Sequence, residues 1–143
     1  MAPDRSVRLN PDQARHERIM RAIALEMQDT PLVLKGGTAL ALLYGLGRHS
    51  VDLDFDCGRA KRVSIKRQGR RGLREVDVPM SAFRRGLPMW KGRRFHVHYV
   101  NRANNADRLL KVELSFRTIP QENDIEVVDG IRTYKTPPCS IRR

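Results

Sequence analysis

Residues 52–55 read Asp-Leu-Asp-Phe, and this alternation of acidic and apolar side chains constrains the chain more than any other feature. In an extended strand, successive side chains point to opposite faces of the sheet. Asp52 and Asp54 are therefore predicted to share one face, while Leu53 and Phe55 point into a core. Two ionised carboxylates side by side repel each other unless a cation lies between them, and all-oxygen ligands suit Mg²⁺ or Mn²⁺. The sequence predicts a strand that carries metal ligands.

A glycine pair precedes this strand by a short segment. Residues 32–40 read LVLKGGTAL, which indicates a strand, a turn at Gly36 and Gly37, and the start of a helix. A helix N-terminus with bare glycine amides favours the binding of phosphate. Thr38 is a further candidate for a phosphate contact, or it caps its own helix. A phosphate site beside metal carboxylates indicates a site that handles nucleotides.

Residues 34–56, LKGGTALALLYGLGRHSVDLDFD, resemble the AbiEii/AbiGii toxin family of nucleotidyltransferases, within the polymerase-β-like superfamily. The family is associated with type IV toxin–antitoxin and abortive-infection systems. Its first motif combines Gly-Gly with Asp-x-Asp and usually has Arg-x-Ser just before the aspartates. A single Asp-x-Asp occurs by chance in many loops, whereas the whole set in this order is specific. The matching positions are Gly36, Gly37, Arg48, Ser50, Asp52 and Asp54.

A third carboxylate is expected on a neighbouring strand. Residues 109–116 read LLKVELSF, which puts Val112, Leu114 and Phe116 on one face and Lys111, Glu113 and Ser115 on the other. The Lys-Val-Glu triplet resembles the second motif of the family, and this resemblance implies that Glu113 is the third metal ligand. The alternative is that Glu113 faces solvent on a half-exposed strand.

The resemblance implies transfer of a nucleoside monophosphate from an NTP to a hydroxyl, with release of pyrophosphate. Asp52 and Asp54 would bridge two metal ions, and Glu113 would hold the catalytic ion and could accept the proton of the hydroxyl. Asp56 is left out of the site because it is expected to lie past the end of the strand.

The phosphate contacts implied by the resemblance come from the glycine pair and from the segment before the aspartates. Gly36 and Gly37 would admit the triphosphate close to the backbone. Arg48 and Ser50 would contact phosphate, since a guanidinium binds phosphate through two parallel hydrogen bonds. Arg48 could instead be a surface cation in the turn after residues 45–47.

The net charge of +12 is concentrated in one part of the chain. Residues 59–94 hold thirteen Lys and Arg but only two acidic residues, Glu75 and Asp77. Such a block binds polyanions with little sequence specificity, and RNA is the polyanion that agrees best with the family. The alternative is a solvated insertion. Phe83 and Trp90 lie within the block and could stack on bases, although anchoring in the core is the favoured interpretation. The candidate nucleic-acid-binding residues are Arg62, Lys66, Arg67, Arg70, Arg71 and Arg74.

The chain is expected to form one α/β domain over residues 1–143, with a nucleotidyltransferase fold in which helices flank a mixed sheet. Asn10 and Pro11 favour a helix start, and the helix is expected to run to about Gln28. A basic helix is expected within residues 59–74, broken at Gly69 and Gly72. His96 and His98 share a face of a strand, where an exposed alternation is favoured over a metal pair. The other expected elements are strands at 32–35, 51–55, 95–100 and 109–116, a helix at 38–44 and a hairpin at 125–135 around Asp129 and Gly130.

Several broader expectations concern the setting of the protein. No stretch is long and apolar enough to span a membrane or to act as the apolar core of a signal peptide. Cys57 and Cys139 are expected to be free thiols of a cytoplasmic protein. The resemblance ends at residues 136–143, so a C-terminal helical region that carries a Lys and an Asp in the family is expected to be missing. A sheet face left uncovered would favour a homo-oligomer.

These observations lead to a metal-dependent nucleotidyltransferase that uses an NTP and acts on an RNA end, with tRNA as the candidate acceptor and an antitoxin as a partner. The alternative is a catalytically inactive basic module that binds RNA or an antitoxin. A metal nuclease also uses clustered carboxylates, but the Gly-Gly phosphate site argues against one.

Overall fold

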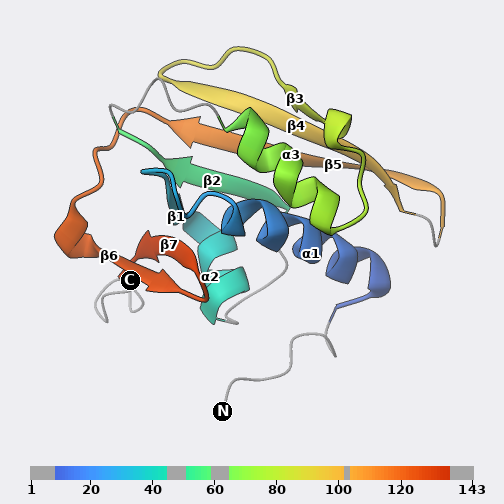
Figure 1. Ribbon diagram of the computed structural model, residues 1–143, viewed down its shortest axis with the longest axis horizontal. Coiled ribbons are helices and arrows are strands. Elements are labelled where there is room, and N and C mark those ends of the chain that lie inside the picture. Colours follow the sequence, from blue (N-terminus) through green and yellow to red (C-terminus); the bar gives the residue numbers. More distant parts are fainter. Residues whose placement is uncertain (1–8, 45–50, 59–64, 102–103, 136–143) are drawn as a thin grey trace.

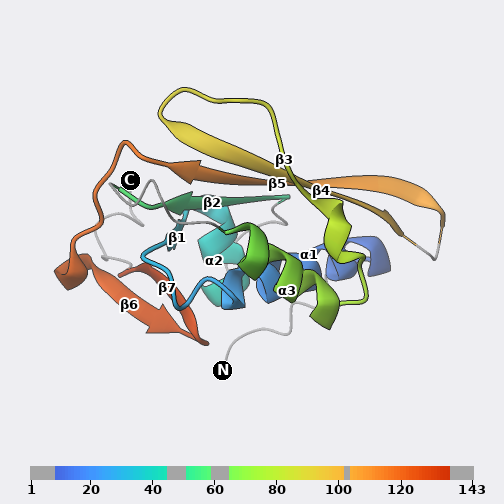
Figure 2. The ribbon, with the colours of Figure 1, turned by 45° about the horizontal axis from the view of Figure 1, so that its top comes forward.

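The computed structural model describes residues 9–44, 51–58, 65–101 and 104–135. Within these residues, seven strands form one mixed sheet in the order β3-β4-β5-β2-β1-β7-β6, and the helices cover one face of it (Figures 1 and 2). The predicted α/β fold is confirmed. The helices are α1 (Pro11–Leu25), α2 (Gly36–Tyr44) and α3 (Lys66–Glu75), and short 3-10 turns span η2 (Met80–Ala82) and η3 (Glu122–Asp124). The strands are β1 (Val33–Lys35), β2 (Asp52–Asp56), β3 (Phe83–Arg85), β4 (Gly92–Asn101), β5 (Ala106–Ser115), β6 (Ile125–Val128) and β7 (Ile131–Tyr134).

Strand β2 lies in the centre of the sheet and pairs with β5 in parallel and with β1 in antiparallel orientation. Strand β5 continues the sheet through its long antiparallel pairing with β4. Leu53 and Phe55 of β2 are buried, together with Val112 and Leu114 of β5. They pack in one apolar cluster with side chains of the three helices. Because side chains alternate along a strand, the other face of β2 and β5 carries the acidic residues.

The local signals read from the sequence place most elements correctly. Asn10 caps α1, and its side chain and that of Gln13 exchange hydrogen bonds with each other's backbone N–H groups. The helix ends at Leu25 rather than near Gln28 as predicted, because the chain continues in tighter turns. The hairpin of β6 and β7 is confirmed, with Asp129 and Gly130 at φ 52° and 81° in its turn.

The predicted break of the basic helix is wrong, since α3 runs without interruption through Gly69 and Gly72. A Cβ atom at Gly69 would lie 2.3 Å from the Phe83 ring, and one at Gly72 would lie 2.8 Å from the carbonyl oxygen of Ala22 in α1. The two glycines therefore let the helix approach β3 and α1 closely. They are packing positions, and their cost in helix propensity is offset by tertiary contact.

The two aromatic residues of the basic block have different surroundings. Phe83 is fully buried and stacks on Phe95, with 5.2 Å between ring centroids. Trp90 is 72% exposed, so the expectation that it anchors in the core is wrong. It belongs to the connection between β3 and β4, where no layer of helices covers it. Cys57 is a free, buried thiol, and burial raises its pKa to about 11; Cys139 lies outside the described residues. Among the described residues, no helix has the length and apolar character needed to cross a membrane.

Candidate active site

A row of four charged side chains crosses the open face of the sheet. Lys35 of β1 is the register partner of Asp54 of β2, Asp54 that of Glu113 of β5, and Glu113 that of Arg94 of β4. Register partners on adjacent strands point to the same face. Asp52 lies two residues before Asp54 and therefore on the same face, as the alternation predicted. The structure thus brings the three predicted carboxylates onto one surface, on two neighbouring strands.

The neighbouring carboxylates disfavour the charged form of Asp54. The pKa of Asp54 is raised, chiefly by burial and further by the charges of Glu113 and Asp52, while Lys35 acts in the opposite direction. Ionised Asp54 is thus unfavourable in free energy at this position, and a bound cation would remove that penalty. The donor set is therefore suited in charge and chemistry to a hard divalent cation.

Arg94 forms an ion pair with Glu113, the third of the predicted metal ligands. Its Nε donates to Oε2 of Glu113 over 2.7 Å, and the side chains of both residues are partly buried. Glu113 is thus drawn toward β4. As they stand, no three His, Cys, Asp or Glu side chains within the described ranges are arranged to hold a metal ion. Glu113 would have to turn from β4 toward β2 to join Asp52 and Asp54.

Asp56 is the last residue of β2 and lies within the strand, contrary to the expectation that it would follow the strand end. Its Oδ1 is 2.7 Å from Lys35 Nζ, and its Oδ2 accepts a hydrogen bond of 2.5 Å from the hydroxyl of Tyr134. Burial and this bond raise the pKa of Tyr134. Asp56 is buried, and its two oxygens face Lys35 and Tyr134. They hold Lys35 at the edge of the carboxylate row.

The glycine pair lies beside Asp54. Gly36 follows Lys35 directly and has φ 79°, and a Cβ placed on it would be 3.8 Å from Oδ2 of Asp54. Gly37 is exposed, and a Cβ there would meet nothing within 4 Å. Thr38 is buried, and its hydroxyl donates to the carbonyl oxygen of Asp52. Thr38 therefore fastens the start of α2 to β2, a contact that neither predicted role of this residue describes.

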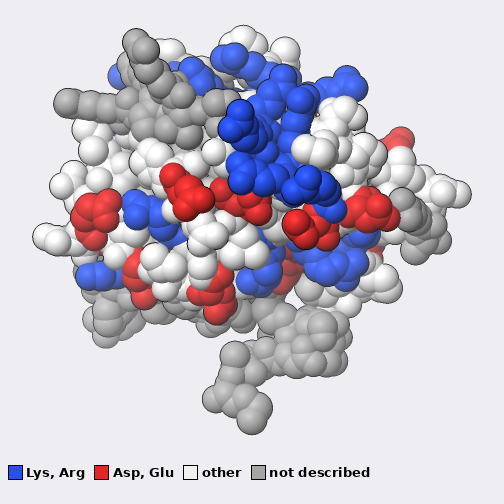
Figure 3. Space-filling view, viewed as in Figure 1, with Lys and Arg blue, Asp and Glu red and all other residues white. Residues whose placement is uncertain are grey.

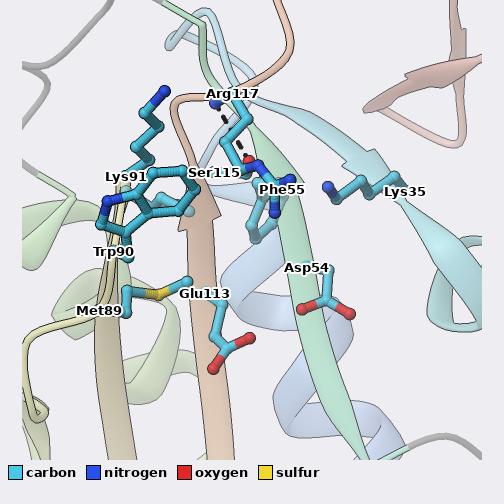
Figure 4. A pocket seen from close by; sticks show the side chains of 10 residues that line it. Lys35, Asp54, Phe55, Met89, Trp90, Lys91, Glu113, Ser115 and Arg117 are labelled. Atoms are coloured by element: carbon cyan, nitrogen blue, oxygen red, sulfur yellow. Dashed lines mark hydrogen bonds between the residues drawn. The ribbon is translucent and has the colours of Figure 1, made fainter.

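A cavity of about 180 Å³ opens on this face (Figure 4). Figure 4 shows Asp54 and Glu113 on adjacent strands, with the tryptophan of the β3–β4 connection at the other side. The sequence did not predict the three cations that line this cavity, Lys35, Lys91 and Arg117. They come from three separate segments that only the strand pairing brings together. The lining residues are Lys35, Asp54, Phe55, Met89, Trp90, Lys91, Glu113, Leu114, Ser115 and Arg117.

The basic helix lies on the other side of the sheet. Leu73 of α3 belongs to the buried cluster that includes Leu53 and Phe55, whereas Asp52 and Asp54 point away from that cluster. Figure 3 shows the cations gathered over α3 on the helical face. Lys66, Arg67, Arg71 and Arg74 are exposed, Arg70 is partly buried, and Arg71 also lies 3.7 Å from Glu26. Arg48, Ser50 and Arg62 lie outside the described residues.

His96 and His98 lie on the open face with their ring centroids 6.3 Å apart. Burial lowers the pKa of His96, as do the nearby charges of His98, Arg94 and Lys111. His98 is exposed while Val97 is buried, which agrees with the favoured interpretation as an exposed alternation.

The comparisons with known proteins agree with this geometry. Residues 18–142 match the family described as the nucleotidyl transferase AbiEii toxin of type IV toxin–antitoxin systems. The crystal structure of JHP933 from Helicobacter pylori superposes with a TM-score of 0.70 and 35% identity, over 89% of this chain and 53% of that one. A second H. pylori structure, of a protein assigned as a nucleotidyltransferase, gives the same TM-score and identity and is covered over 55% of its length.

This chain thus spans about half the length of the two solved structures that it resembles. No curated protein matches the sequence significantly. The family match, by contrast, extends over most of the chain and includes the glycine pair, all three carboxylates and the basic helix. The chain belongs to the AbiEii family of nucleotidyl transferase toxins of type IV toxin–antitoxin systems.

Proposed function

We propose that this chain transfers a nucleoside monophosphate from an NTP to a hydroxyl group at the end of an RNA, with tRNA as the candidate acceptor. One observation carries the proposal: Asp54 and Glu113 are register partners on adjacent strands, with Asp52 on the same face and the Gly36-Gly37 turn beside them. Membership of a nucleotidyl transferase family supports the same reaction.

Asp52, Asp54 and Glu113 are the residues that would hold Mg²⁺ or Mn²⁺. When bound, the ion supplies Lewis-acid stabilisation of the charge on the phosphates and on the attacking and leaving oxygens. The raised pKa of Asp54 supports this assignment, because a cation bound here would compensate the charge that burial, Glu113 and Asp52 disfavour.

The side chains around the cavity have separate tasks in the transfer. The oxygen of the acceptor hydroxyl forms a bond to the α-phosphorus as the bond to the bridging oxygen breaks, and pyrophosphate leaves with that electron pair. The Glu113 carboxylate accepts the proton of the hydroxyl. Lys35, Lys91 and Arg117 offer positive charge to the triphosphate and to the leaving pyrophosphate. The exposed backbone at Gly36 and Gly37 lets phosphate oxygens come close to the start of α2.

RNA would bind first through the exposed cations of α3. Because α3 and the carboxylates lie on opposite faces of the sheet, an RNA held by α3 would have to pass around an edge of the sheet for its end to reach Glu113. Helix α3 is thus proposed as an anchor for the polyanion, apart from the place of reaction. An antitoxin partner follows from the family and stays a prediction, as does a homo-oligomer.

A second candidate function is a catalytically inactive module that binds RNA or an antitoxin. The Arg94–Glu113 ion pair favours it, because the arginine already compensates the charge of the carboxylate that a metal ion would need. The two candidates differ in whether nucleotide is transferred, since charge-driven RNA binding through α3 is expected of both.

The test is the transfer of label from α-labelled NTPs to a bulk RNA pool in the presence of Mg²⁺ or Mn²⁺. Asp52→Asn, Asp54→Asn and Glu113→Gln should each abolish labelling and leave RNA binding unchanged. Asp107→Asn, which changes an exposed carboxylate on the same strand as Glu113, is the matched control and should label normally. A wild-type protein that neither labels RNA nor binds NTP with either metal by calorimetry would exclude the transferase and leave the binding module.

A further inference from the structure

Trp90 is exposed at the wall of the carboxylate cavity. Its side chain is 72% accessible, and it lines the cavity that also contains Asp54 and Glu113. An indole left in water at this position makes little contribution to the core. Large aromatic side chains that stay exposed next to a polar cavity are commonly used for contact with a ligand.

The backbone around Trp90 is held firmly against the end of β5. The carbonyl oxygen of Lys91 accepts a hydrogen bond of 2.9 Å from the backbone N–H of Phe116. Gly92 permits the close approach, since a Cβ there would lie 2.4 Å from the carbonyl oxygen of Leu114. Lys91 takes the left-handed conformation, with φ 51°, to complete the turn. The exposed indole is therefore carried on a backbone that is already in place before any ligand binds.

Two cations accompany the indole. Lys91 Nζ lies 4.6 Å from its ring centroid and Arg117 Cζ lies 5.6 Å from it, both within the range of cation–π attraction. The backbone N–H of Arg117 donates to Oγ of Ser115 over 3.2 Å, which ties this residue to the end of β5 (Figure 4). The cavity thus combines an aromatic surface with two cations over it and a pair of carboxylates at its other side.

We propose that Trp90 is the platform on which the base of the incoming nucleoside triphosphate stacks, in place of the Lys91 and Arg117 side chains, which turn from the ring to the phosphates. The inference rests on the proposed function and adds to it the subsite that binds the base. A ligand that fits all three parts of the cavity has an aromatic ring, a polyanionic chain, and phosphates that share a cation with carboxylates. Stacking on an indole tolerates every base, so the platform provides affinity with little discrimination among the four NTPs.

The alternative occupant of Trp90 is the apolar surface of a partner protein. Leu87 is equally exposed, at 72%, on the same β3–β4 connection, but it does not line the cavity. Leu87→Ala is therefore a matched control: a protein interface would use both residues, whereas a base platform uses Trp90 alone.

Trp90 is the only tryptophan of the chain, so its intrinsic fluorescence reports on this site directly. The protein is titrated with non-hydrolysable NTP analogues and Mg²⁺, and in parallel with tripolyphosphate and Mg²⁺, which has the charge but lacks the base. The nucleotides should quench the fluorescence strongly, and tripolyphosphate should compete with them while quenching little. By calorimetry, Trp90→Ala should weaken nucleotide binding about 5- to 150-fold and leave tripolyphosphate binding unchanged. Trp90→Phe should restore most of the affinity, and Leu87→Ala should not alter it.

The other outcomes overturn either the platform alone or the proposed function with it. Equal quenching by tripolyphosphate and nucleotide, or unchanged nucleotide affinity in Trp90→Ala, would overturn the platform while the nucleotide site remains. Quenching by a short RNA and not by free nucleotides would assign the platform to the acceptor and overturn its assignment to the NTP. If neither nucleotide nor tripolyphosphate binds, both the proposed function and the base subsite are wrong.

Discussion

Arg94 Nε donates to Oε2 of Glu113 over 2.7 Å, at the carboxylate that the site would need for a metal ion. In the absence of a metal ion, the Arg94 guanidinium provides the positive charge that compensates the Glu113 carboxylate. Because the arginine and a metal ion are both drawn to the Glu113 carboxylate and repel each other, the two cations compete for it.

We therefore expect Arg94→Gln to bind Mn²⁺ more tightly than the wild type, by about 2- to 5-fold, which corresponds to the loss of a partly exposed ion pair. Isothermal titration calorimetry with Mn²⁺ measures this directly. Arg84→Gln is the control, since Arg84 is an exposed arginine on the neighbouring strand β3 and its Nε bonds to the carbonyl oxygen of Ser81. Weaker metal binding in Arg94→Gln would mean that Arg94 positions Glu113 for the metal instead of competing with it.

Asp54→Asn should stabilise the metal-free protein at neutral pH. The pKa of Asp54 is raised in the folded chain, mainly by burial and then by Glu113 and Asp52, so the folded state holds this proton more tightly than the unfolded state does. Stability therefore falls as pH rises from the ordinary value of 3.8 through the folded pKa, and the asparagine variant avoids that loss.

The measurement is thermal unfolding of the wild type and of Asp54→Asn in the presence of a chelator, from acid conditions to pH 7. The melting temperature of Asp54→Asn should exceed that of the wild type at pH 7, and the difference should vanish under acid conditions. With saturating Mg²⁺ the order should reverse, since only the wild type gains stability by binding the ion. A variant that is less stable than the wild type at every pH in chelator would show that the charge of Asp54 is compensated within the protein.

Local patterns predicted local structure, and long-range pairing supplied the rest of the site. The alternation of residues 52–55 was enough to assign the two faces of β2, and Asn10 with Gln13 was enough to start α1. Nothing in the local sequence tells which residue of β4 lies opposite Glu113, so the pairing with Arg94 could not be foreseen. Gly72 shows the same limit: its role is set by the backbone of Ala22, which is distant in the sequence.

RNA binding should depend on the exposed cations of α3 and not on those of the open face. Replacing Lys66, Arg67 and Arg74 by Gln should reduce the slope of log affinity against log salt by roughly 2 units, at about 0.7 for each lost phosphate contact with single-stranded RNA. Lys111→Gln, an exposed cation on the carboxylate face, should change the slope little. NTP binding should be unchanged in the triple variant, since α3 lies across the sheet. An unaltered salt dependence would make α3 a solvated surface only.

Gly72→Ala should destabilise the protein by about 1–3 kcal/mol, the usual cost of forcing an extra carbon into a packed contact. The new Cβ would lie 2.8 Å from a backbone oxygen of α1, and a backbone atom cannot rotate away as a side chain can. Urea denaturation measures the change. A neutral or stabilising effect, as helix propensity alone would give, would show that α1 and α3 are not packed this closely.

Gly37→Ala separates folding from phosphate binding at the start of α2. A Cβ at Gly37 meets nothing within 4 Å, and its φ is not in the left-handed region, so the substitution should be tolerated or should stabilise the fold by about 0.4–1 kcal/mol. The open space is the space that the triphosphate is proposed to use, and a methyl group there would keep phosphate oxygens from the backbone amides. We expect tripolyphosphate and NTP to lose affinity by the same factor, because the base does not reach this position. Calorimetry with both ligands, together with a melting curve, makes the test. Unchanged affinity in a fully folded Gly37→Ala protein would move the triphosphate away from the glycine pair and toward Lys91 and Arg117.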